Sequence, residues 1–337
     1  MSEQATFRAT PTPVSVPATM RAMVIDQTGP ATVFRQAVVP TPLQLNSEVL
    51  VKIVAAGVNP IDAKTRSGKG VSAGIDEFPA VLGYDFSGHV VQSPFELHPF
   101  KPGDEVYGMT LSPRYQGSYA EYASVPSICI ARKPPTLSHV EAAAVPLAAL
   151  TAWGMVVEVA RAHEAQRILI HGGAGGVGHF AIQFARYFGA YVIATGSTHS
   201  TGWLRELGAN QVIDYTTSRF EDVAADIDVV IDLVGNVHDD TGSRSLLVLR
   251  PGGLLISAPS GGWPGLVADA AAAGVRGTSY KVAPDGATLA VISRLLESGD
   301  VKVFVDQIYD LADVSAAHTA LETGHTRGKM VLKVSEG

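Results

Sequence analysis

The spacing of apolar residues changes near the middle of the chain. Up to about residue 127, short apolar runs, such as residues 23–25, 49–54 and 87–91, are separated by glycine and proline. Short runs with turn residues between them are typical of antiparallel strands. The first part of the chain is therefore predicted to be a compact β domain.

A different pattern follows. A helix is predicted over residues 138–160, with Ser138 as its N-cap and Glu141 at the capping-box position. Strands and helices then alternate, which is the pattern of a doubly wound parallel sheet. The strands are expected at 168–170, 191–195, 211–213, 229–233 and 253–257, and the helices include 177–188 and 204–207. A helix is predicted over 287–297, and strands are predicted over 303–308 and 330–334. These elements indicate that the chain returns to the first domain.

A glycine-rich run at residues 171–178 joins an apolar strand to a helix, and Gly173, Gly175 and Gly178 fit the pattern G-x-G-x-x-G. One glycine is needed for a tight turn, one for approach of a pyrophosphate and one for close helix–strand packing. Between a strand and a helix, this pattern favours dinucleotide binding over a structural turn. The predicted phosphate-binding residues are Gly173, Ala174, Gly175, Gly176, Val177 and Gly178.

The segment after the second strand of the alternating region bears on the choice of nucleotide. NAD-binding units usually carry an acidic residue roughly 20 positions beyond the glycines. No Asp or Glu occurs from residue 186 to 205, where the chain offers Ser197, Thr198 and Ser200 instead. Hydroxyl groups can donate to a 2′-phosphate, so NADPH is predicted rather than NADH. The alternative is an ordinary polar loop.

Composition narrows the possible partners. The 337 residues carry a net charge of −7 without a long basic run, so nucleic acid is not expected as a partner. No apolar stretch approaches the roughly 18 residues of a membrane span, so no membrane partner is expected. The single cysteine, Cys129, rules out an internal disulfide and predicts a reducing compartment such as the cytoplasm. Residues 1–19 are predicted to form a flexible tail.

Several segments together resemble one protein family. They are AGVNPID at residues 56–62, LGYDFSG at 82–88, PGDEV at 102–106, GSYAEY at 117–122 and RGKMVL at 327–332. In this order, around the glycine run, they resemble the zinc-independent quinone oxidoreductase and enone reductase branch of the medium-chain dehydrogenase/reductase superfamily. The resemblance implies an α/β protein: a GroES-like β domain (20–145 and 283–337) split by a Rossmann domain (146–282). It also implies a homodimer.

The resemblance bears on metal content and on the reaction. Zinc-dependent members carry their ligands where this chain resembles them at Asn59, Tyr84 and Leu147. An amide, a phenol and an alkyl group do not make a zinc site, so no metal is expected. The implied activity is NADPH-dependent hydride transfer to a quinone or to the C=C of an α,β-unsaturated carbonyl. The alternatives are an enoyl-thioester reductase and a nucleotide-binding sensor or structural protein without catalysis.

Three residues are the catalytic candidates that the resemblance implies. Asn59 would lie over the nicotinamide and hold a ribose hydroxyl or a substrate carbonyl; the alternative is a turn former before Pro60. Lys64 would stabilise the oxyanion formed after hydride addition, unless it is a solvated surface lysine. Tyr84 would form a wall of the site or donate a proton.

The resemblance also implies further contacts to the cofactor. The predicted cofactor-binding residues are Thr151, Tyr215, Val234, Ser257, Arg327 and Lys329. The alternatives are a hydroxyl bonded within its own helix for Thr151, a core aromatic for Tyr215, and solvated charges capping the last strand for Arg327 and Lys329. His163 and His318 are expected at the surface, and His171 is expected to order the glycine run.

Overall fold

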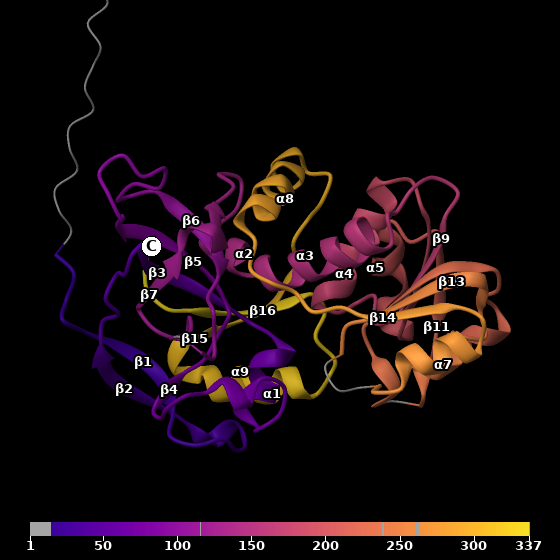
Figure 1. Cartoon of the computed structure of the whole chain (residues 1–337), viewed down its shortest axis with the longest axis horizontal. Coiled ribbons are helices and arrows are strands. Elements are labelled where there is room, and N and C mark those ends of the chain that lie inside the picture. Colours follow the sequence, from indigo (N-terminus) through magenta and orange to yellow (C-terminus); the bar gives the residue numbers. More distant parts are fainter. Residues whose placement is uncertain (1–14, 115, 238, 260–262, 337) are drawn as a thin grey trace, which may run out of the picture.

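The computed structural model describes residues 15–114, 116–237, 239–259 and 263–336, so most of the predicted N-terminal tail lies outside the described residues. Figure 1 shows two lobes, one rich in β-strands and one built on a parallel sheet, with α8, α3 and α4 near the middle of the view. The chain starts in the first lobe, builds the second and returns to the first.

The first lobe contains a three-stranded sheet and a seven-stranded sheet. The smaller has the order β2-β1-β4; the larger has the order β15-β16-β3-β5-β6-β8, with β7 also paired to β3. The strands are β1 (Thr19–Ile25), β2 (Phe34–Pro40), β3 (Glu48–Val58), β4 (Ala80–Val81), β5 (Asp85–Gln92), β6 (Glu105–Met109), β7 (Tyr122–Pro126), β8 (Ile130–Arg132), β15 (Val305–Asp310) and β16 (Lys329–Lys333). Because β16 pairs antiparallel with β3, the predicted return of the chain to this lobe is confirmed.

Two helices of the first lobe were not predicted. Helix α1 (Pro60–Arg66) follows β3 directly, and α9 (Val314–Glu322) connects the parallel strands β15 and β16. Both are short, at 7 and 9 residues, and α9 has no side-chain cap at its N-terminus. Short helices depend on tertiary packing for their stability, and the start signal of α1, with Asn59 as N-cap and Pro60 at the first position, was not recognised as a helix start.

The second lobe is a six-stranded parallel sheet with the order β11-β10-β9-β12-β13-β14. This is the 3-2-1-4-5-6 order of a Rossmann fold. Its strands are β9 (Arg167–Ile170), β10 (Tyr191–Gly196), β11 (Gln211–Asp214), β12 (Ile227–Asp232), β13 (Leu249–Ser257) and β14 (Arg276–Ser279), and its helices are α4 (Gly176–Tyr187), α5 (Thr201–Glu206), α6 (Thr241–Ser245) and α7 (Leu266–Ala272). All five predicted strands are present; β14 and α7 were missed, and α6 lies where a helix between strands was expected but not named.

The helix predicted over residues 138–160 is not continuous. It forms α2 (His139–Ala143), α3 (Pro146–Trp153) and a π-helical segment (Gly154–Val159). Pro146 has no N–H for an α-helical bond and clashes with the preceding turn, so a new helix begins there. The predicted capping box is confirmed, because Glu141 N–H donates to Ser138 Oγ at 3.2 Å and Ser138 N–H donates to Glu141 Oε2 at 2.8 Å.

An apolar core spans the junction of the two lobes. It contains Met109 of β6, Leu150 of α3, Phe180 of α4 and Leu289 of α8 (Gly286–Ser298), all at most 4% exposed. The hydroxyl of Tyr107 adds a polar link, since it donates to the carbonyl of Leu289 at 3.1 Å. This shared core fixes the edge of the first lobe beside the start of α4.

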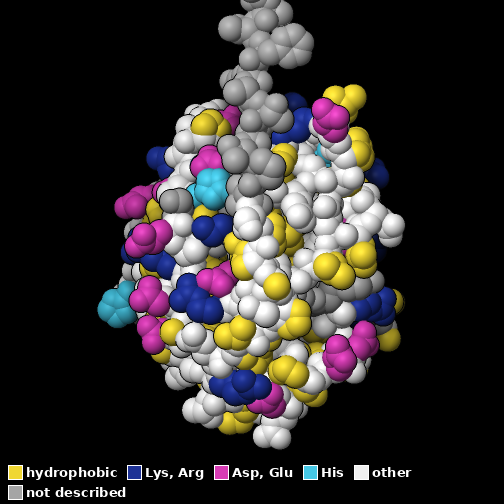
Figure 2. Space-filling view, turned by 90° about the vertical axis from the view of Figure 1, so that its left-hand side faces the viewer, with side chains coloured by type: hydrophobic (Ala, Val, Ile, Leu, Met, Phe, Trp, Pro, Cys, Tyr) yellow, Lys and Arg dark blue, Asp and Glu magenta, His cyan; other side chains and the backbone are white. Residues whose placement is uncertain are grey.

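The surface of the first lobe carries charges of both signs. On the face of the first lobe shown in Figure 2, acidic, basic and apolar side chains are interspersed, and neither sign of charge forms a continuous field. Among the described residues, no helix combines the length and the hydropathy needed to cross a membrane.

Candidate functional site

The glycine run forms a loop between β9 and α4, and its glycines have three distinct environments. Gly172 has a φ of +68°, so the tight turn lies one residue before Gly173, the first glycine of the G-x-G-x-x-G pattern. A Cβ on Gly178 would lie 2.3 Å from the carbonyl oxygen of Gly172, which requires glycine for close packing. A Cβ on Gly175 would meet only that same oxygen, at 3.4 Å. The loop is therefore open at Gly175, next to the first turn of α4, as a pyrophosphate requires.

The C-terminal strand is joined to this loop. Gly328 N–H donates to the carbonyl of Ala174 at 2.9 Å. A Cβ on Gly176 would lie 2.9 Å from Cδ of Lys329, so the lysine stem lies against the glycine loop. Gly328 has a φ of +79° and lies so close to the Phe304 carbonyl that a side chain would not fit. These contacts place the start of β16 beside the predicted phosphate site.

Lys329 belongs to a buried polar cluster. Its Nζ donates to the carbonyl of Val58 at 3.0 Å and to Asn59 Oδ1, and lies 3.4 Å from Oδ2 of Asp85. Asn59 Nδ2 donates to the same carboxylate oxygen at 2.9 Å, and the other oxygen of Asp85 accepts from Leu147 N–H at 2.8 Å. Lys329, Asn59 and Asp85 are 3%, 1% and 0% exposed, so the alternative of Lys329 as a solvated cap is wrong.

Burial acts on both charges of this cluster. It lowers the pKa of Lys329 and raises the pKa of Asp85, while the attraction between the two groups opposes both shifts. Removing charges from water is costly unless they are paired and hydrogen-bonded, and here both conditions are met. The sequence reasoning missed Asp85, although a lone carboxylate just before the apolar run 87–91 was a usable signal.

A second buried carboxylate, that of Asp62, binds the backbone N–H of Asn59. Asp62 Oδ2 accepts from Asn59 N–H at 2.9 Å, and the Asp62 side chain is 1% exposed. Its Oδ1 has no hydrogen-bond partner among the described residues. Burial and then the nearby charge of Asp85 raise the pKa of Asp62 to about 7. Asp62 lies in the segment 56–62 that carries the family resemblance, but the sequence pattern alone predicted no role for it.

Tyr84 and Lys64 are both half-buried, and Tyr84 lies near Asp62. Tyr84 packs against the apolar core at the lobe junction, and burial, followed by the charge of Asp62, raises the pKa of its phenol. The phenol therefore keeps its proton and can donate a hydrogen bond. Lys64 lies on α1, where burial and then Lys69 lower the pKa of its ammonium group. Within the described part of the chain, no carboxylate lies in ion-pair range of Lys64.

The end of β10 differs from the prediction. Ser200 is 7% exposed and its hydroxyl donates to the carbonyl of Ser197 at 2.9 Å, so that proton is not available to a phosphate. Thr198 Oγ1 donates to Asp214 Oδ2 at 2.6 Å. This carboxylate was missed because it comes from the end of β11, outside the segment 186–205. Tyr215 is 60% exposed, so the alternative of a core aromatic is wrong for it.

The remaining predicted cofactor contacts lie in three different settings. Thr151 Oγ1 donates to the carbonyl of Leu147 at 2.6 Å, as in the helix-interior alternative. Asp232 organises the strand ends, because its carboxylate accepts from Val234 N–H and Ser257 Oγ, both at 2.9 Å. Arg327 is exposed, and its guanidinium lies over the Trp203 ring at 4.4 Å.

His171, His163 and His318 differ in burial. His171 is buried, with ring nitrogens 3.2 Å from Thr195 Oγ1 and 3.0 Å from Ser245 Oγ, which links the start of the glycine run to β10 and α6. His163 is exposed, as expected. His318 is not at the surface: it is 0% exposed on α9, and its Nε2 lies 3.1 Å from the Tyr119 hydroxyl. That error follows from missing α9.

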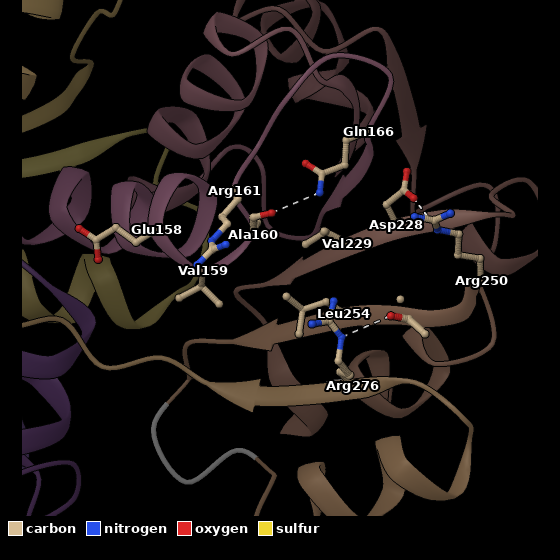
Figure 3. Close-up of a pocket in the computed structure, with 12 residues that line it drawn as sticks. Glu158, Val159, Ala160, Arg161, Gln166, Asp228, Val229, Arg250, Leu254 and Arg276 are labelled. Carbon is tan, nitrogen blue, oxygen red and sulfur yellow. Dashed lines mark hydrogen bonds and ion pairs between the residues drawn. The ribbon is translucent and has the colours of Figure 1, made fainter.

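A hollow of about 430 Å³ lies elsewhere on the second lobe. Figure 3 shows it among Arg161, Arg250 and Arg276, near the ion pair between Arg250 and Asp228. It lies at the amino ends of β9, β12 and β14, whereas ligands of such sheets bind at the carboxyl ends. The glycine loop and the Lys329 cluster therefore remain the candidate site.

Comparisons with known proteins agree with this geometry. Residues 46–135 match the family model of the alcohol dehydrogenase GroES-like domain, and residues 207–332 match that of the zinc-binding dehydrogenase. The chain is 38% identical to the 2-methylene-furan-3-one reductase of Solanum lycopersicum, over 98% of this chain and 83% of that protein. It belongs to the medium-chain dehydrogenase/reductase superfamily, in the quinone and enone reductase branch.

Solved structures support membership of this superfamily. The quinone oxidoreductase of Coxiella burnetii matches with a TM-score of 0.89 and 36% identity, over 94% of this chain and 100% of that one. A mycobacterial protein solved in complex with NADPH matches with a TM-score of 0.82 and 29% identity, over 94% and 100% of the two chains. In superfamily terms, the first lobe is the GroES-like domain and the second is the Rossmann domain.

Proposed function

We propose that this chain is an NADPH-dependent, zinc-independent reductase that transfers a hydride to a quinone or to the β-carbon of an α,β-unsaturated carbonyl. The observation that carries the proposal is the Lys329–Asn59–Asp85 cluster lying directly against the open glycine loop. The related tomato protein is a reductase of a methylene-furanone, and the related Coxiella protein is a quinone oxidoreductase. Both names point to electron-poor acceptors.

The proposed cofactor fits the residues present. The loop around Gly175 has room for a pyrophosphate. Ser197 and Thr198 follow the end of β10, and the exposed Arg327 lies over the Trp203 ring. When bound, NADPH supplies the hydride. The NADPH complex of the mycobacterial relative supports this cofactor. The carboxylate of Asp214, bonded to Thr198, would repel a 2′-phosphate. The preference for NADPH over NADH is therefore expected to be smaller than Ser197 and Thr198 alone suggest.

The side chains of the site have separate tasks in this proposal. As the acceptor gains a hydride, negative charge develops on its carbonyl oxygen, and fixed donors lower the barrier. The Tyr84 phenol and the Lys64 ammonium are the proposed donors. Asn59 already donates one N–H to Asp85, and its second N–H remains for a ribose hydroxyl or the substrate carbonyl. A proton from water then completes the reduction at the α-carbon.

Zinc independence rests on the side chains at the family's ligand positions. Asn59 and Tyr84 supply an amide and a phenol, and Leu147 contributes only its backbone N–H to Asp85. In place of a metal ion, the ammonium of Lys329 gives the site a fixed positive charge that Asp85 and Asn59 hold in position. A quinone or enone needs no Lewis acid to accept a hydride, whereas alcohol oxidation commonly uses one.

Isotope transfer tests this proposal. With NADPH carrying deuterium at C4 and a simple enone, we expect one deuterium at the β-carbon of a saturated ketone. Deuterium on the carbonyl carbon, with an allylic alcohol as product, would instead indicate a carbonyl reductase. A homodimer and a cytoplasmic location are also proposed, the first from the family resemblance and the second from the single, buried Cys129.

A further inference from the structure

Three side chains with metal-binding atoms meet on the first lobe, outside the cofactor site. His89 on β5 and Glu105 on β6 are directly opposite each other in the antiparallel pair, and His139 is the first residue of α2. One ligand atom from each residue lies within 4.8 Å of those of the other two. A cross-strand pair and the start of a packed helix hold this cluster, so it does not depend on a flexible loop.

The separation of two of these atoms suits a shared metal ion. His139 Nε2 lies 3.2 Å from Glu105 Oε1. Two ligands of a tetrahedral zinc ion, each about 2.0–2.2 Å from the metal, are about 3.3–3.5 Å apart. The same Nε2 is buried and has no hydrogen-bond partner among the residues that the structure describes. The nitrogen and the carboxylate oxygen therefore face each other at a separation that suits two ligands of one ion.

Ser87 fixes which nitrogen of His139 carries the proton. The Ser87 hydroxyl donates to the Val106 carbonyl at 3.1 Å, so its oxygen is left to accept from His139 Nδ1, 2.8 Å away. Nε2 of the neutral ring then presents a lone pair to a carboxylate, an arrangement that a cation would stabilise. Metal-binding histidines usually have such a partner on the other ring nitrogen.

Lys133 leaves one oxygen of Glu105 available. Its Nζ lies 3.3 Å from Oε2, the oxygen that does not face His139, and also donates to the Leu137 carbonyl at 2.6 Å. The Glu105 side chain is 46% exposed, so water can reach Oε1 and complete a coordination shell. Two imidazoles and one carboxylate, with water in the fourth position, form a common zinc ligand set.

We propose that His89, Glu105 Oε1 and His139 Nε2 bind one divalent transition-metal ion, with Zn²⁺ as the expected occupant. The ion would join β5, β6 and α2, and so stiffen the first lobe. Asp85 of the proposed reaction site lies four residues before His89 on β5, about 13 Å away, so this ion takes no part in hydride transfer. Sequence reasoning expected no metal, because it considered only the family's ligand positions.

Calorimetric titration of the metal-stripped full-length chain with ZnCl₂ tests the proposal. We expect one saturable site, an affinity at least tenfold lower in each of His89→Gln and His139→Gln, and a roughly 10- to 100-fold loss in Ser87→Ala. His163→Gln, which changes an exposed histidine of the other lobe, is the matched control and should bind as the wild type does. Circular dichroism of each apo variant establishes that it is folded.

Thermal unfolding gives an independent readout. Zn²⁺ should raise the Tm of the wild type and of His163→Gln, but not that of His139→Gln. The proposal is overturned if no saturable site is found, or if the folded His89→Gln and His139→Gln variants keep wild-type affinity within twofold. Turnover with NADPH should be unchanged by removal of the metal, which separates this proposal from that of the reductase activity.

Discussion

Nζ of Lys329 lies 3.4 Å from Oδ2 of Asp85, and both side chains are buried. Lys329 begins the last strand and Asp85 begins β5, so the pair joins two distant parts of the chain. Asn59 lies between them, since its Oδ1 accepts from Lys329 and its Nδ2 donates to Asp85. The pair thus fixes the orientation of the amide that is proposed to face cofactor and substrate.

Replacing Lys329 with Met should destabilise the protein strongly. The lysine side chain is 3% exposed and its partner 0%, so the change leaves an uncompensated buried carboxylate. Breaking such a pair typically costs about 3–5 kcal/mol. Urea unfolding at neutral pH measures the loss. The double variant Lys329→Met/Asp85→Asn should recover part of it, and no recovery would show that Lys329 acts mainly through packing.

The exposed ion pair between Arg35 and Asp26 provides a contrast for this experiment. Its side chains are 50% and 53% exposed. Pairs in such positions contribute little because water and salt screen them. Arg35→Met should therefore change the unfolding midpoint much less than Lys329→Met, and equal effects would argue against a special role for the buried pair.

Asp62 predicts a dependence of stability on pH. Burial raises its pKa from 3.8 to about 7 in the folded protein, so unfolding releases a proton between about pH 4 and pH 7. The stability that the protonated form contributes below pH 4 is lost as the pH rises through 7, up to an upper bound of about 4 kcal/mol. Asp62→Asn removes this titration.

Urea unfolding of the wild type and of Asp62→Asn at several pH values tests this expectation. The Asn variant keeps an acceptor for Asn59 N–H but never ionises. Its stability relative to the wild type should increase between pH 4 and pH 7. If the difference between the two proteins is constant over that range, Asp62 has an ordinary pKa.

Gly175→Asp should abolish NADPH binding while the fold is retained. A side chain at Gly175 meets only the Gly172 carbonyl, at 3.4 Å, so the protein accommodates it, but the carboxylate would occupy the predicted pyrophosphate site. Fluorescence titration measures the affinity. Gly175→Ala, which adds a methyl group without charge, should bind more weakly than the wild type but more tightly than Gly175→Asp. Unchanged binding in a folded Gly175→Asp would remove this loop as the phosphate site.

Lys64→Met should lower turnover of enones about 100- to 1000-fold, because it removes a donor to the developing oxyanion. Binding of NADPH should change little, and quinones should be affected less than enones. Lys69→Met, five residues further on and exposed, is the matched control. Steady-state kinetics measure enone turnover by both variants. Turnover of Lys64→Met within twofold of the wild type would show that Lys64 is a surface lysine with no role in the reaction.

Local patterns in the sequence were enough to predict the architecture, but not the partners of individual side chains. The alternation after residue 160 predicted all five strands it named, since a parallel sheet buries both faces of each strand. Pro146 shows the limit, because periodicity alone continued a helix that the missing N–H interrupts. The partners of Lys329, Thr198 and His318 come from elements distant in sequence, which local patterns do not bring together.

The most direct test of the proposed reaction is turnover after exhaustive chelation, with NADPH and NADH compared in parallel. The chelated protein should oxidise NADPH in the presence of a simple enone or a benzoquinone, with one saturated ketone or hydroquinone formed per NADPH consumed. Turnover at low cofactor concentration should be faster with NADPH than with NADH. Loss of activity on chelation, restored by added zinc and accompanied by alcohol oxidation, would contradict the account.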